Sequence, residues 1–293
     1  MLVIKKLGIK QIITITWRFD LLMILFCGVI YLVNTNLFKT LVLPASFPAL
    51  LGTAVAFFIG FNNNQAYNRW WEARTIWGSI VNDSRTFTRN INAFCKDYPN
   101  KDLLIHRHLL FLNSLTASLR KYKLQPQDLT YINQDLLYKH CNSTPTSLLN
   151  IQANNIVEMY QQQIIDGFQF NSLNNLLQNF CDSMGKSERI NNTPYPITYL
   201  YFTELSIWIF ILLATLAMVP LIGVWSIFFG WLIGFVYNVI DLNGREMMNP
   251  FVDAPMCIPL NMIVRNIEIT ALNEISSEQT PEPLENLNNI YIN

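Results

Sequence analysis

Residues 52–74 read GTAVAFFIGFNNNQAYNRWWEAR. The first ten of these residues are small or apolar, and they pass directly into amides and then into an Arg-Trp-Trp-Glu-Ala-Arg block. An apolar helix followed by tryptophans and arginines is typical of a membrane span at its exit into water. The stretch therefore predicts a helix that leaves a membrane near Phe61.

The apolar run before this exit belongs to one of two long regions that almost lack charge. The chain has 293 residues, of which 51% are hydrophobic and 14% are charged, whereas soluble domains are about 25% charged. Residues 21–61 contain a single charged side chain, Lys39, and residues 196–240 contain only Glu204. Because one span needs about 20 apolar residues, each region is long enough for a hairpin of two spans.

The pattern predicts an all-α protein with four transmembrane helices and a cytoplasmic helical bundle. Apolar side chains recur at helical spacing in the polar middle of the chain, for example over residues 103–115. The predicted segments are an N-terminal cytoplasmic segment (1–20), a first transmembrane hairpin (21–61), a cytoplasmic helical region (62–196), a second transmembrane hairpin (197–241) and a cytoplasmic C-terminal segment (242–293). The first hairpin is expected to turn at residues 34–40.

The distribution of basic residues predicts which side of the membrane each segment occupies. Four basic residues precede the first span, and Arg69 and Arg74 follow the second. Under the positive-inside rule, both ends of the first hairpin face the cytoplasm. Arg189 and Arg245 flank the second hairpin in the same way. We therefore expect a multi-pass membrane protein with cytoplasmic termini.

Several functional classes are disfavoured. The net charge is zero, so no nucleic-acid partner is expected, and the five scattered cysteines form no CxxC pair that would predict a zinc site. His106 and His108 would lie on different faces of a helix, so a shared metal is not expected and a solvated surface is predicted for them. We find no catalytic triad or phosphate loop, so the sequence predicts no enzyme, no catalytic residue and no metal site.

The second span carries a regular stripe. Thr53, Phe57 and Phe61 are four residues apart, so they share one helix face. This face is either a packing stripe between helices or a hydrophobic constriction that lines a pore. The amides that follow, among them Asn63 and Asn64, could line a wet passage, or they could simply end a helix anchored by aromatic residues.

Three blocks of the sequence resemble the bestrophin family in its bacterial branch. They occur in the family's order, and together with the four-span layout they cover nearly the whole chain. The most specific block contains the charged and aromatic residues Arg69, Trp70, Trp71, Glu72 and Arg74. The blocks are FFIGFNNNQAYNRWWEAR (57–74) followed by WG, NTPYPITY (192–199) and NGREMMNPF (243–251).

The resemblance implies a homopentameric ion channel whose pore is lined by the second span of each subunit. It places the pore neck at Thr53, Phe57 and Phe61, and a cytoplasmic aperture at Tyr195. The amides Asn63 and Asn64 then form the pore exit. The implied activity is passive conduction of small monovalent ions, with chloride and other anions favoured. The implied location is a bacterial inner or plasma membrane. A cation-selective channel of the same fold and a non-conducting membrane scaffold remain open as alternatives.

The sequence departs from the family pattern at several positions. Thr53 and Tyr195 replace residues that are usually apolar, and Asn62 stands where many bacterial relatives have a basic residue. The calcium-binding run of animal members is reduced to Asp253, and calcium normally takes 6 to 8 oxygen ligands. We therefore expect no cofactor. Glu204 is expected either to reach interfacial water or to pair with a neighbouring helix. The expected partners are other copies of the chain, membrane lipids and small inorganic ions.

Overall fold

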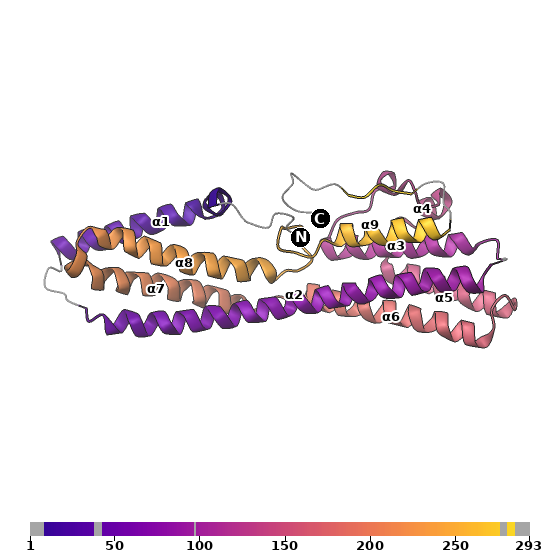
Figure 1. Cartoon of the computed structure of the whole chain (residues 1–293), viewed down its shortest axis with the longest axis horizontal. Helices are drawn as coiled ribbons and strands as arrows, with labels where there is room; N and C mark the ends of the chain where they lie inside the picture. The colour runs from indigo at the N-terminus through magenta and orange to yellow at the C-terminus, as the bar shows by residue number, and fades with distance from the viewer. Residues whose placement is uncertain (1–8, 38–42, 97, 276–279, 285–293) are drawn as a thin grey trace. The chain divides into compact units, whose positions relative to one another are not determined.

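The computed structural model describes residues 9–37, 43–96, 98–275 and 280–284. Regular structure in these residues is helical throughout, which confirms the all-α prediction (Figure 1). The elements are α1 (Ile9–Asn36), α2 (Ser46–Phe94), α3 (Lys101–Arg120), the 3-10 helix η1 (Pro126–Leu129), α4 (Gln134–His140), α5 (Pro145–Gln161), α6 (Gly167–Asn192), α7 (Ile197–Ile222), α8 (Trp225–Met247) and α9 (Leu260–Glu274). The predicted turn at 34–40 and both terminal segments fall partly outside the described residues.

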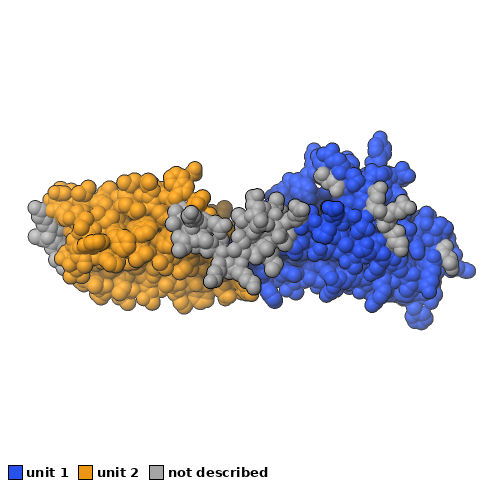
Figure 2. Space-filling model, turned by 45° about the horizontal axis from the view of Figure 1, so that its top comes forward, with its two compact units in different colours: residues 1–3, 70–193, 249–293 blue, residues 4–69, 194–248 orange. Residues whose placement is uncertain are grey.

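The chain divides into two compact units, which Figure 2 shows in different colours. Unit 1 comprises residues 70–193 and 249–293 together with residues 1–3, and unit 2 comprises residues 4–69 and 194–248. Helix α2 contributes its first part to unit 2 and its second part to unit 1. The assignment of the predicted segments to the two sides of a membrane stays a prediction.

Unit 2 contains the apolar helices. Helices α1, α7 and α8 pack against one another, and α7 is joined to α8 by a tight turn at Gly223, whose φ is +56°. Within the described residues, four helical segments are long and apolar enough to cross a membrane: 14–36, 46–94, 197–222 and 225–247. Their shared core consists of Met23, Cys27, Val55, Ile59, Ile207, Phe210, Ile211 and Ala214.

Close helix contact in unit 2 depends on glycine at α8. A Cβ atom added at Gly234 would lie 2.7 Å from the Met23 Cε atom of α1 and 2.9 Å from the Ile211 Cδ1 atom of α7. Atoms at such distances overlap, so a side chain at this position would force one of the neighbours away. Small residues are the usual means by which membrane helices approach closely.

The helices continue beyond the predicted ends of the spans. Helix α2 runs without interruption over 49 residues, although its apolar stretch ends at Phe61, and α8 continues to Met247, beyond the apolar stretch that ends at Ile240. The change in polarity marks a change of surroundings and not the end of a helix. No proline lies between residues 49 and 94 to break the hydrogen-bond ladder of α2.

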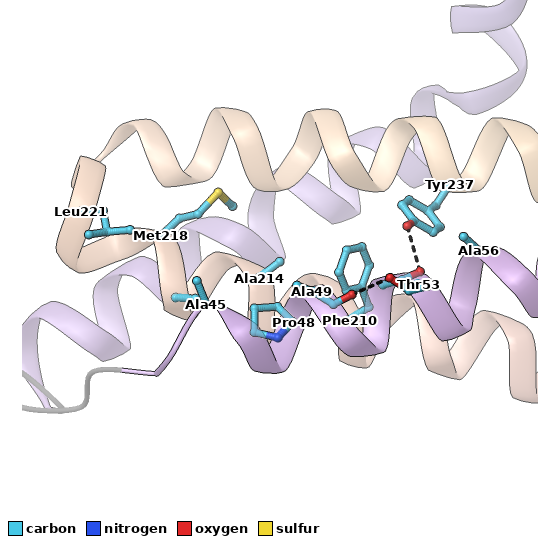
Figure 3. A pocket seen from close by; sticks show the side chains of 12 residues that line it. Ala45, Pro48, Ala49, Thr53, Ala56, Phe210, Ala214, Met218, Leu221 and Tyr237 are labelled. Carbon is cyan, nitrogen blue, oxygen red and sulfur yellow. Dashed lines mark hydrogen bonds between the residues drawn. The ribbon is translucent and has the colours of Figure 1, made fainter.

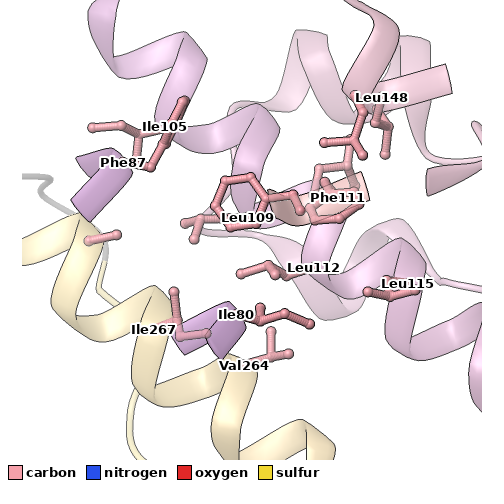
Figure 4. Close-up of a cluster of buried hydrophobic side chains, with 14 of the residues drawn as sticks. Ile80, Phe87, Ile105, Leu109, Phe111, Leu112, Leu115, Leu148, Val264 and Ile267 are labelled. Carbon is pink, nitrogen blue, oxygen red and sulfur yellow. The ribbon is translucent and has the colours of Figure 1, made fainter. Parts of the chain in front are cut away.

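Unit 1 is a helical bundle with a large apolar core (Figure 4). Helix α3 packs against α5, α6 and α9, and Leu109 and Leu112 of α3 are fully buried among residues of α2, α5 and α9. Helix α9, which comes from the C-terminal segment, contributes Val264 and Ile267 to this core. The C-terminal segment up to Glu274 is therefore an integral part of the bundle.

The prediction of a solvated surface is wrong for His108. Its side chain is completely buried, with its ring centroid 4.6 Å from that of Phe180 and 5.1 Å from that of Phe87. His108 Nε2 lies 2.9 Å from Ser84 Oγ. That hydroxyl donates its own proton to the Ile80 carbonyl, so it accepts from Nε2–H. Burial lowers the pKa of His108 to about 3, and the ring is neutral at physiological pH.

Because His108 is buried in its neutral form, we expect the free energy of unfolding to fall in acid. The unfolded chain binds a proton near pH 6.5, whereas the folded chain resists it until about pH 3. The neutral His108 ring therefore makes its full contribution to the free energy of unfolding above pH 6.5. This contribution decreases as the pH falls, by about 2 kcal/mol at about pH 5. Replacing His108 with leucine should reduce the acid-induced fall in melting temperature of the detergent-solubilised protein. An unchanged pH profile would show that other groups dominate.

Candidate functional site

One face of α2 presents a continuous strip of exposed side chains. At about 100° per residue, its members all lie within about 40° of Phe57 around the helix axis. We call this set the exposed strip: Thr53, Phe57, Phe61, Asn64 and Asn68, all of which are exposed. The opposite face carries buried Val55, Ile59 and Asn62. The part of α2 in unit 2 therefore has one side in the subunit core and the other turned outward.

The aromatic part of the strip is unusually exposed for residues of its size. Phe57 and Phe61 are 63% and 51% exposed. Their ring centroids are 4.4 Å apart with an interplanar angle of 82°, which is a favourable edge-to-face contact. The two rings thus form one apolar surface along the helix.

Thr53 is less polar in this setting than its residue type suggests. Its hydroxyl donates to the carbonyl of Ala49 at 2.9 Å, within the same helix (Figure 3). A threonine bonded in this way has its donor satisfied by the backbone. The departure from an apolar residue at this position therefore leaves no free hydroxyl proton on the strip.

Tyr195 meets α2 through a buried amide. Asn62 is 4% exposed, and its Nδ2 atom donates to Thr203 Oγ1 of α7 at 2.8 Å. The Tyr195 hydroxyl in turn donates to Asn62 Oδ1 at 3.5 Å. Burial raises the pKa of Tyr195, so its phenol stays protonated and neutral at physiological pH. Two departures from the family pattern, at Asn62 and Tyr195, are therefore partners of each other, which sequence reasoning missed.

Asn63 and Asn64, which the sequence grouped together, have different surroundings. Asn64 lies on the exposed strip. Asn63 is about 120° away from Phe57 around the helix, and its Nδ2 atom donates to the Ile240 carbonyl of α8 at 2.9 Å. A Cβ atom at Gly244 would lie 1.9 Å from Asn63 Oδ1. Glycine at 244 is thus what lets this amide reach α8, and it links two of the sequence blocks.

The charged and aromatic block after the amides lies entirely within α2. Trp70 packs against the core of unit 1, whereas Trp71 and Arg74 are exposed and Arg69 is half-buried. Glu72 forms an ion pair with Arg189 of α6. The side chains of Glu72 and Arg189 are both well exposed, so their ion pair contributes little to stability.

Glu204 pairs with a neighbouring helix, which is one of the two expected outcomes. Its Oε2 atom lies 3.2 Å from Arg245 Nη2 of α8. The same guanidinium binds Asp241, with 2.6 Å between Nε and Oδ2. Arg245 thus joins one exposed and one buried carboxylate at the ends of α7 and α8. None of these three residues belongs to the exposed strip.

The structure offers no ligand set for a metal ion within the ranges it describes. Asp253, which the resemblance aligns with a calcium-binding acidic run, is exposed in the loop before α9. No three His, Cys, Asp or Glu side chains of the described residues cluster closely enough to hold a metal ion. The absence of a cofactor stays a prediction from the sequence.

A protein-family model described as bacterial/fungal bestrophin protein matches residues 9–273, which is most of the chain. The chain belongs to the bestrophin family. This bestrophin is 28% identical over 84% of its length to a voltage-dependent anion channel-forming protein of Nostoc, of which the match covers 86%. It is 26% identical to a protein with the same description from Escherichia coli K12, over 80% of this chain and 77% of that protein.

Solved structures agree with the family assignment. A crystal structure of a bacterial bestrophin homologue from Klebsiella pneumoniae matches this bestrophin with a TM-score of 0.80. The two chains are 24% identical, and the match covers 89% of this chain and 98% of the other. The likeness establishes a shared fold, and with the four apolar helices it identifies an integral membrane protein.

Proposed function

We propose that this bestrophin is an anion channel that conducts passively through a pore formed by several copies of the chain. The exposed strip of α2 carries the proposal. Its phenylalanines are poorly suited to bulk water, and its amides are poorly suited to lipid, where an unpaired polar group is costly. A pore with a narrow apolar neck followed by a water-filled passage would accommodate both the phenylalanines and the amides. The printed descriptions of the Nostoc and Escherichia coli relatives support anions as the permeant ions.

One subunit cannot enclose a pore with a single strip, so several copies are needed, and five is the number that the family resemblance implies. A hollow of about 510 Å³ beside Thr53 supports packing by another subunit (Figure 3). It is lined mostly by alanines and other apolar residues of α2 and α7, with Tyr237 of α8 at one side. Mass measurement of the purified protein in detergent should give five chains. A stable monomer or dimer would refute the assembly.

Within the assembly, Thr53, Phe57 and Phe61 form the neck. Asn64 follows on the same strip at the pore exit, while Asn63 braces α2 against α8 at that level. Tyr195 forms the cytoplasmic aperture, in keeping with cytoplasmic termini and a cytoplasmic unit 1. An enzyme is disfavoured because the pathway offers no nucleophile and base in the arrangement that catalysis needs.

The proposed lining has no fixed charge. Selectivity by charge normally uses rings of acidic or basic side chains, so discrimination between anions and cations should here be modest. Glu204 is held by Arg245 away from the strip. We therefore expect Glu204→Gln to keep the sign of the reversal potential in a salt gradient. An inverted sign would place Glu204 in the pore and would favour the cation-selective alternative.

Tyr195→Ala is expected to change the permeability ratios of ions that differ in size. The substitution removes a ring held by its bond to Asn62, which widens the proposed aperture. Tyr195→Phe is the matched control, since it keeps the ring and loses only the hydroxyl. Bi-ionic reversal potentials measure the ratios. Unchanged ratios in the alanine variant, with assembly intact, would remove Tyr195 from the pathway.

Flux separates a channel from a non-conducting scaffold. Liposomes that contain the purified protein should release trapped chloride faster than protein-free liposomes when a counter-ion pathway is supplied. Release at the protein-free rate, with pentamers present in the membrane, would contradict a channel and favour the non-conducting scaffold.

A further inference from the structure

Unit 2 contains a second cavity that the conduction pathway does not use. It has a volume of about 220 Å³ and is lined by residues from the N-terminal halves of α1 and α7 and from the C-terminal half of α8. Its lining combines charged and polar side chains, Arg18, Glu204, Asn238, Asp241 and Arg245, with apolar ones such as Phe19. The volume is several times the roughly 30 Å³ that one water molecule occupies in the liquid. It is also smaller than the pocket of a drug-sized ligand.

The unpaired side-chain amide of Asn238 indicates that the cavity binds a ligand. The residue is 7% exposed, and its Nδ2 atom has no hydrogen-bond partner within the described chain. Leaving a buried donor unsatisfied costs about 1–3 kcal/mol, so such groups normally have a partner. Asn238 lines the cavity, where an acceptor atom of a bound molecule can satisfy its amide.

The charges of the lining are separated into two parts. Arg245 is shared between Glu204 and Asp241, so this triad has a net charge of −1. Arg18 has no carboxylate of the described residues within ion-pair distance. The cavity thus has a negative part at the triad, a positive side chain at Arg18 and a neutral donor at Asn238. A simple anion would be attracted by one part and repelled by the other.

A molecule with both a phosphate and an ammonium group fits this arrangement. Arg18 and the Asn238 amide suit the phosphate oxygens, since guanidinium groups bind phosphate strongly. Glu204 is half exposed, with only Oε2 bonded to Arg245, so Oε1 can accept from a primary ammonium. Arg18 lies near the start of the first span and Arg245 near the end of the fourth, which is the level of lipid headgroups.

We propose that this cavity binds a phosphoethanolamine group, presented by a phospholipid whose acyl chains lie along the apolar surface beside Phe19. The phosphate contacts Arg18 and Asn238, and the ammonium contacts Glu204. The site is separate from the conduction pathway, so it stands whether or not the protein conducts.

The test is native mass spectrometry of the delipidated full-length protein in detergent. The probes are the dioctanoyl forms of phosphatidylethanolamine, phosphatidylglycerol and phosphatidylcholine, and free phosphoethanolamine. We expect one phosphatidylethanolamine per subunit, bound about tenfold more tightly than the other two lipids. Equal affinity for free phosphoethanolamine would keep the headgroup chemistry and assign the site to a soluble ligand. Equal or tighter binding of phosphatidylglycerol would overturn the proposal.

Substitutions in the lining test whether the bound lipid occupies this cavity. Arg18→Gln, Asn238→Leu and Glu204→Gln should each weaken phosphatidylethanolamine binding by about tenfold. Arg18 and Glu204 are exposed, so their variants test the site even if Asn238→Leu fails to fold. Asn243→Leu on α8 and Arg89→Gln on α2 change exposed residues that do not line the cavity. Equal binding by site variants and controls would mean that lipid only coats the protein surface.

Discussion

Replacing Phe57 and Phe61 together with alanine is expected to raise single-channel conductance or open probability by about tenfold, which corresponds to a barrier lowered by about 1.4 kcal/mol. In the proposed pore, the two exposed rings of each subunit surround a narrow apolar passage. Such a passage excludes water and therefore opposes ions. Alanine widens the passage and reduces the apolar surface, so water and ions enter more readily. Planar-bilayer recording of the double variant measures the effect.

Phe58→Ala is the matched control for this experiment. Phe58 is exposed to a similar degree, at 56%, but it lies about 100° around the helix from Phe57 and outside the exposed strip. Its removal should leave conductance near the parent value. If the double variant conducts like the parent while it still assembles, the two phenylalanines serve packing and the neck lies elsewhere.

Glu268→Ala is expected to destabilise the protein by about 3–5 kcal/mol, the usual cost of breaking a buried charged network. Glu268 of α9 is 1% exposed. Its Oε1 atom accepts from Asn113 Nδ2 at 2.6 Å and from the Tyr131 hydroxyl at 2.7 Å. Its Oε2 atom lies 3.2 Å from Arg265 Nε. The alanine variant leaves Asn113 and Tyr131 without their shared acceptor and removes the carboxylate that pairs with the Arg265 guanidinium.

Thermal unfolding in detergent, followed by tryptophan fluorescence, measures this loss. Glu268→Gln keeps an acceptor for Asn113 and Tyr131, so it should lose less stability than the alanine variant. Glu158→Ala removes an exposed carboxylate of the same unit and should change the melting temperature little. The network would have no structural role if Glu268→Ala melted at the temperature of Glu158→Ala.

The sequence predicted those features that depend on local pattern. Two regions with almost no charge predicted the apolar helices, and the four-residue spacing placed Thr53, Phe57 and Phe61 on one face of α2. Their role in a pore stays a prediction. Local pattern could not predict that α2 continues for 49 residues, because a change from apolar to polar residues was read as a boundary.

Contacts between distant segments were beyond sequence reasoning. His108 has a polar side chain, and nothing near it in the chain indicates that Phe87 and Phe180 enclose it. The bond between Tyr195 and Asn62 joins residues that are 133 positions apart. The one available signal was that both residues depart from the family pattern. Gly244 could have been suspected from its place in a family block, but its contact with Asn63 required the fold.

The reversal potential of the purified protein in a planar bilayer, under a potassium chloride gradient, tests the central claim most directly. The account predicts currents carried through a pentamer, with a reversal potential displaced toward the chloride equilibrium value by a modest amount. Neutral side chains along the exposed strip are the reason for the modest displacement. A displacement toward the potassium value would contradict anion conduction, and a membrane that contains pentamers but carries no current would contradict a channel altogether.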